Sequence, residues 1–84
     1  MVSSLIRVIR AHAIDEHRVS VVFSDNHRGI FDMAPWMGHN DVFAPLSTQS
    51  AFTTARSDGQ TVIWLDGSID IAPETVYEHT VFEN

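Results

Sequence analysis

The chain has 84 residues, of which 44% are hydrophobic and 10% aromatic, and its formal charge is −6. That length predicts one domain over residues 1–84, and that composition is typical of a globular protein. The chain contains no cysteine, which excludes disulfides, thiol nucleophiles and cysteine-based zinc sites and leaves the redox compartment open. No apolar run approaches the about 20 residues that a membrane helix needs. The start of the chain lacks the pattern of a secretory signal. We therefore expect a cytoplasmic protein with no membrane partner.

The five basic residues are all arginines, and they are dispersed along the sequence among eleven acids. Nucleic-acid binding depends on basic groups that neutralise phosphates. The acidic, dispersed pattern therefore predicts no nucleic-acid partner. An acidic surface suits a basic protein partner, because complementary charge speeds association.

The first part of the chain predicts a three-stranded antiparallel meander. Residues 5–14 are rich in Ile and Val and contain no Gly or Pro, which indicates a strand. Apolar and polar side chains alternate over 18–24, as in a strand with one face on a core. A polar turn at 24–29 leads to a short strand over 30–33, which Pro35 ends.

The middle of the chain predicts an irregular apolar loop over 35–45, then a short central helix over 47–52 with Ser47 as its N-cap. Asp58-Gly59 is the strongest local signal, a two-residue turn suited to type I′ geometry between strands at 53–57 and 60–65. The second of these strands is apolar on both faces, so we expect it to be covered.

The end of the chain predicts a short helix that begins at Pro73, where the missing N–H of proline costs nothing. Val76, Tyr77 and Val81 would cover one side of this helix. The expected fold class is therefore α+β: an antiparallel β-meander plus a second hairpin, with one short central helix and a short C-terminal helix.

Asp-x-Ala-Pro occurs twice, at 32–35 and 70–73. A pair of carboxylates could do acid–base chemistry, but each of these stands where an extended run must stop. We interpret Asp32 and Asp70 as structural residues that accept hydrogen bonds from backbone N–H groups, and Pro73 as a structural helix start. No nucleophile elbow and no phosphate-binding loop is present, so we predict no catalytic residue and no cofactor.

The tightest group of possible metal ligands consists of His12, Asp15, Glu16 and His17. The two histidines could meet across a hairpin. A metal site needs three or four converging ligands, however, and this spacing matches no established motif. We predict no metal and interpret residues 15–17 as a solvated turn.

Three apolar residues of the irregular loop, Trp36, Met37 and Phe43, are the predicted partner-binding residues. Aromatic residues and Met are enriched at protein interfaces. The alternative role for these residues is to close the open end of the core. A small fold with neither disulfide nor metal often gains burial by self-association, so we expect a homo-oligomer, with a dimer favoured.

Several segments, taken in order, resemble the domain of unknown function 2442 family. They are Val19-x-Val21-x-Phe23 before a polar turn, Phe31-Asp32-Met33, Phe43-Ala44-Pro45-Leu46 with Phe52, Val62-Ile63-Trp64, Gly67, and Asp70-Ile71-Ala72-Pro73 with Tyr77-Glu78. The resemblance implies a small bacterial α+β domain with no known catalytic residues. It also implies an antitoxin-like role beside another small protein in a two-gene module.

The sequence therefore favours a non-enzymatic interaction module that binds a small protein partner. The alternative is a small-ligand-binding or enzymatic domain, whose pocket would lie near His39, Asp41 and Trp64.

Overall fold

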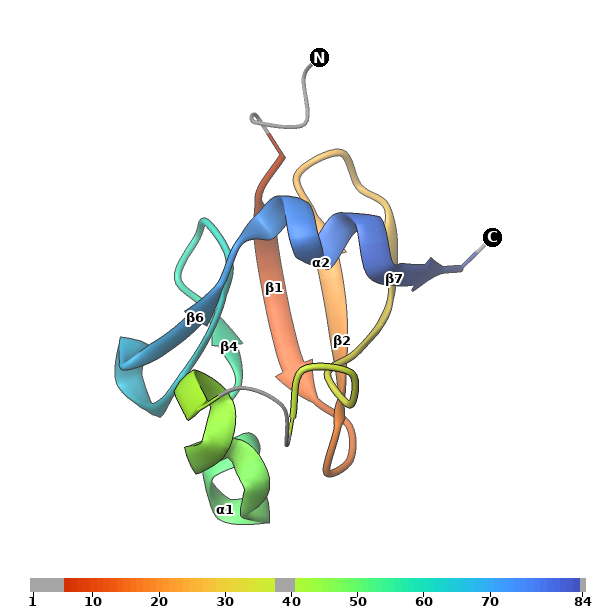
Figure 1. The fold of residues 1–84 in the computed structure, drawn as a ribbon. Coiled ribbons are helices and arrows are strands. Elements are labelled where there is room, and N and C mark those ends of the chain that lie inside the picture. Colours follow the sequence, from red (N-terminus) through yellow and green to blue (C-terminus); the bar gives the residue numbers. More distant parts are fainter. Residues whose placement is uncertain (1–5, 38–40, 84) are drawn as a thin grey trace.

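The computed structural model describes residues 6–37 and 41–83 and contains two antiparallel sheets with short helices (Figure 1). The first sheet has the strand order β1-β2-β3-β7, with β1 at Val8–Ala13, β2 at Arg18–Phe23, β3 at Arg28–Asp32 and β7 at Thr80–Phe82. The second sheet has the order β4-β5-β6, with β4 at Arg56–Ser57, β5 at Val62–Trp64 and β6 at Ile69–Ile71. The α-helices are α1 (Gln49–Phe52) and α2 (Pro73–His79), and the 3-10 helices are η2 (Asp41–Ser47) and η3 (Leu65–Gly67). The predicted α+β class is confirmed.

One face of the first sheet forms the core together with the second sheet and the helices. In Figure 1, α2 runs from the end of β6 across the first sheet to β7. The alternation predicted for β2 holds, since its residues at 19, 21 and 23 are fully buried. The side chains of the core come from both sheets and from the helices: Val8, Val19, Val21, Phe23, Phe31, Met33, Phe43, Leu46, Phe52, Ala55, Val62, Trp64, Ile69, Ile71 and Val76.

The predicted meander is confirmed and gains a fourth strand that the sequence analysis missed. Strand β7 pairs antiparallel with β3, with Ile30 opposite Val81 and Gly29 opposite Phe82. Val81 thus lies in a strand, and the prediction that it covers one side of the helix is wrong. The helix ends one residue before β7, where the Thr80 hydroxyl donates a hydrogen bond to the Val76 carbonyl at 2.6 Å. A three-residue strand is too short for period-two alternation to reveal it.

The predicted type I′ turn at Asp58-Gly59 is wrong. Ser57 pairs with Val62, so four residues connect β4 and β5. Gly59 has a φ of 93°, but Asp58 is not among the residues with positive φ, which type I′ geometry requires at both positions. The Asp58 carboxylate instead accepts hydrogen bonds from the N–H groups of Thr61 at 3.0 Å and Gln60 at 2.9 Å, which stabilise the wider turn. These two bonds lower the pKa of Asp58.

The central helix begins two residues later than predicted, because η2 extends through Ser47. The N-cap is Thr48, whose side chain accepts a hydrogen bond from the Ala51 N–H at 3.3 Å. Strand β5 is buried at all three residues, as expected for a covered strand. Within residues 6–37 and 41–83, no helix is long and apolar enough to cross a membrane.

Candidate interaction surface

The first sheet has a second face that points away from the core. Directly opposite residues share a face of a sheet, so the register places His12, Ser20, Ile30 and Val81 in one row across all four strands. These side chains are half-buried or exposed. We call this side of the sheet the open face, formed by Arg10, His12, Arg18, Ser20, Val22, Arg28, Ile30, Asp32, Val81 and Glu83.

The centre of the open face is apolar. Val22 and Ile30 are half-buried on neighbouring strands, and Val81 on the edge strand is 75% exposed. The opposite face of the same strands already packs in the core. The apolar side chains of the open face therefore cannot be buried there. An uncovered apolar area of this kind is typical of a surface that meets another molecule.

Three of the five arginines lie on the open face. Arg10 and Arg28 are both register partners of Val22, one on each neighbouring strand, so the two arginines flank this valine. Neither makes an ion pair with a residue that the structure describes. Arg18 is instead bound to Asp15 at 2.7 Å. Arginines that are dispersed in the sequence are therefore gathered by strand pairing, which the sequence analysis did not anticipate.

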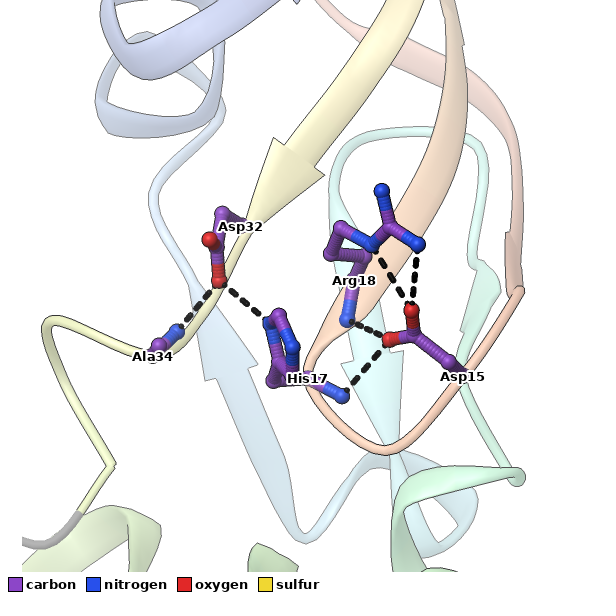
Figure 2. Close-up of polar contacts among 5 residues, drawn as sticks. All are labelled: Asp15, His17, Arg18, Asp32 and Ala34. Atoms are coloured by element: carbon purple, nitrogen blue, oxygen red, sulfur yellow. Dashed lines mark hydrogen bonds and ion pairs between the residues drawn. The ribbon is translucent and has the colours of Figure 1, made fainter.

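A polar cluster closes the turn between β1 and β2, at one end of the open face (Figure 2). The Asp15 carboxylate accepts hydrogen bonds from the backbone N–H groups of His17 at 3.0 Å and Arg18 at 2.9 Å, and from the Arg18 Nε at 2.7 Å. These bonds lower the pKa of Asp15 to about 2, and the bond from the His17 N–H has the largest effect. The cluster is a side-chain-stabilised turn of the kind that Asp favours.

The other half of the cluster links His17 to Asp32 at the end of β3 (Figure 2). The Asp32 Oδ1 lies 2.8 Å from the His17 Nδ1 and accepts a hydrogen bond from the Ala34 N–H at 2.8 Å. The bond to Asp32 raises the pKa of His17. Burial acts to raise the pKa of Asp32, but the bonds from Ala34 and His17 outweigh it and the net shift is downward.

This pair makes the stability of the fold depend on pH. Because the folded pKa of His17 is raised above 6.5, its contribution is present below that value and is lost as pH rises through the folded pKa. The contribution of Asp32 is present above pH 3.8 and is lost as pH falls through its lowered folded pKa.

We therefore expect His17→Gln to destabilise the fold more at about pH 5 than at about pH 8.5, as measured by denaturant unfolding. The control is His12→Gln, because the His12 ring hydrogen-bonds to no described residue. An equal cost of His17→Gln at both pH values would contradict this coupling.

A second polar cluster lies at the opposite end of the sheet and joins α2 to the turn between β2 and β3. The Tyr77 hydroxyl donates a hydrogen bond to Asp25 Oδ2 at 2.7 Å, and the His27 Nδ1 lies 2.9 Å from the same oxygen. The bond to Asp25 raises the pKa of Tyr77. Tyr77 also packs edge-on against Phe23, with ring centroids 4.8 Å apart. The cluster therefore anchors the helix, and the His27 side chain, at 62% exposure, lacks the enclosure of a catalytic base.

The predicted structural residues occupy the following places. The Asp32 carboxylate accepts a hydrogen bond from the Ala34 N–H, at the start of the turn that follows β3. Asp70 is exposed and pairs with Ile63 in the second sheet, and its side chain makes no hydrogen bond to any residue in the described part of the chain. Pro73 is the first residue of α2, and Ala72 precedes it as an N-cap without a side-chain hydrogen bond.

The predicted partner-binding residues lie on the core side of the molecule and not on the open face. Trp36 is half-buried between Phe31 and His79, with ring centroids 5.3 Å and 5.1 Å away. Met37 is half-buried against the core, and Phe43 is 7% exposed within it. Partner binding through these three residues stays a prediction, although Phe43 offers little surface to a partner.

The predicted small-ligand pocket falls largely outside the described residues. His39 is not among them, and neither is the side chain of Asp41. Trp64 is fully buried, and its indole N–H has no hydrogen-bond partner among the described residues. In the same part of the chain, no group of three or more His, Asp or Glu side chains is arranged to hold a metal ion.

Two packed antiparallel sheets with one open, arginine-flanked face define a small α+β domain. Residues 8–81 of this chain match the family described as "Protein of unknown function (DUF2442)", and the chain belongs to that family. No curated protein and no solved structure matches the chain.

Proposed function

We propose that this chain is a non-enzymatic protein-interaction module that acts in the cytoplasm as the antitoxin-like partner in a two-gene bacterial module. One observation carries the proposal: the open face is a sheet surface with an apolar centre that no segment within residues 6–37 and 41–83 covers. A sheet gains stability when an apolar face is buried against another layer. Since the chain's own helices are used on the core side, the second layer comes from another protein.

The polar groups of the domain favour binding over catalysis. His17 and Asp32 have side-chain exposures of 38% and 50%, and both are already engaged in the turn that they stabilise. A catalytic acid or base is usually found in a concave pocket that excludes water around it. Two well-exposed, hydrogen-bonded residues at a turn do not supply one.

The open edge of β7 supports the proposed dimer. The Glu83 N–H bonds to the Arg28 carbonyl at 2.9 Å, so in the alternating antiparallel pattern Phe82 directs its N–H and C=O away from β3. Val81 and Phe82 are 75% and 37% exposed beside that edge. An unpaired strand edge readily adds another strand, and we propose that the edge of a second copy adds here. Light scattering at micromolar concentration checks it, and a monomer would contradict it.

The interaction itself is tested by placing a charge at the centre of the open face. We expect Ile30→Glu to weaken binding to the protein encoded by the adjacent gene by at least about tenfold, because a buried carboxylate without a partner opposes association. Val42→Glu is the matched control, since Val42 is 61% exposed on η2, away from the open face. Affinity is measured by titration calorimetry after circular dichroism has shown that both variants are folded.

Two results would overturn the proposed function. One is that the adjacent gene product does not bind the unmodified chain. The other is that Ile30→Glu and Val42→Glu bind with equal affinity, which would remove the open face from the interaction.

A further inference from the structure

We propose that the segment which covers the open face is an acidic amphipathic segment of the partner protein. Its apolar residues would pack on Val22, Ile30 and Val81, and its carboxylates would bind Arg10 and Arg28. This inference rests on the proposed function, because it names the chemistry of the partner at the same surface.

The geometry of the arginines carries the inference. Arg10 and Arg28 lie on either side of Val22 and are both exposed. Neither guanidinium is neutralised by a described carboxylate. A guanidinium group binds a carboxylate through two parallel hydrogen bonds, which orient the partner as well as attract it. Two such groups about an apolar centre match a segment with carboxylates on both sides of an apolar stripe.

The distribution of charge strengthens the inference. The whole chain carries −6, whereas the described residues of the open face include three of the five arginines and two acids, Asp32, which is bound to His17, and Glu83. Glu83 lies opposite Arg28 in the strand register but makes no ion pair with it. The acids of the second sheet and α2 lie elsewhere: Asp58, Asp66, Asp70, Glu74 and Glu78. Three of the five arginines therefore lie on the surface that also has an apolar centre, and the two that make no ion pair with a described residue give a complementary partner both attraction and orientation.

Two other occupants fit this surface less well. Nucleic acid would be repelled by the net negative charge, and none of the described residues of the open face is a Trp, Tyr or Phe on which a base could stack. A second copy placed face to face would set the Arg10 and Arg28 groups of both chains near one another, where like charges oppose contact.

The test uses the full chain in its native host with a benzoylphenylalanine photocrosslinker at Ser20, in the middle of the open face. Crosslinked products are identified by mass spectrometry in three backgrounds: unmodified, Arg10→Glu and Arg56→Glu. Arg56 is the matched control because it is exposed on β4 of the second sheet and paired with Asp66. We expect one protein segment rich in Asp or Glu to be captured, with yield reduced at least about tenfold by Arg10→Glu and unchanged by Arg56→Glu.

Each other outcome overturns the inference. Capture of nucleic acid would replace it with a different partner class, and capture of a basic or uncharged segment would contradict the charge match. Capture that is insensitive to Arg10→Glu would leave the proposed function standing and remove this inference alone. If no crosslink forms at Ser20 and no open-face variant loses binding, both the proposed function and this inference are wrong.

Discussion

Replacing Gly29 with alanine is expected to displace β7 from the first sheet. A methyl group at this position would lie 2.7 Å from the Thr80 Cγ2 and 2.9 Å from the Phe82 Cα, and it would collide with the Val81 carbonyl oxygen. Two of these atoms belong to the backbone of β7, so the strand itself must move. Overpacking of this kind typically costs about 1–3 kcal/mol in the free energy of unfolding.

The displacement of β7 would also weaken the packing of its neighbours. Phe82 contacts Phe23 and Tyr77, with ring centroids 5.7 Å and 5.0 Å apart, so displacing it also loosens the aromatic packing that holds α2. The proposed dimer would dissociate as well, because its edge strand would be lost. Thermal unfolding and light scattering measure the two effects. A variant with the melting temperature and the oligomeric state of the unmodified chain would contradict the packing described for Gly29.

Replacing Trp64 with alanine is expected to reduce the free energy of unfolding by about 3–5 kcal/mol, the range for truncating a buried aromatic residue. Trp64 has no exposed surface and packs on Phe52 with ring centroids 5.9 Å apart, between the second sheet and α1. This cost is a large part of the total, since the free energy of unfolding of a typical domain is about 5–15 kcal/mol. Denaturant unfolding should show a variant that is close to unfolded at room temperature.

Trp64→Phe is the control that separates lost volume from the lost indole N–H. That N–H has no partner among the residues described, so its removal relieves a buried polar group while most of the ring packing is kept. We expect Trp64→Phe to cost less than about 1.5 kcal/mol. A cost equal to that of Trp64→Ala would show instead that the indole N–H makes a necessary hydrogen bond, as a ligand site around Trp64 would require.

Local patterns in the sequence were sufficient to predict the meander, the covered strand β5 and the start of α2. Each depends on short-range chemistry: alternation over 18–24, an apolar run at 61–65, and a proline at the first turn of a helix. The error at Asp58-Gly59 arose because a side chain competes with a backbone pattern. Asp58 bonds two backbone N–H groups and widens the turn that Asp-Gly predicted to be tight.

The open face could not be predicted in the same way. Arg10 and Arg28 are far apart in the sequence and become neighbours of Val22 only through the register of three strands. The pairing of β1 with β2 is also irregular between Val8 and Arg10. A strict two-residue alternation from Val8 therefore assigns Arg10 to the core face, which is wrong. Of the residues predicted to bind a partner, Phe43 lies in the core and Trp36 and Met37 pack against it.

Methyl cross-saturation in the complex with the adjacent gene product shows which surface of the chain contacts the partner. With the chain deuterated except at its methyl groups, saturation of the partner should reach the methyl groups of Val22, Ile30 and Val81 and leave that of Val42 unaffected. Saturation transferred to Met37 while the open-face methyl groups stay unaffected would show that the interface is the loop after β3 and not the open face.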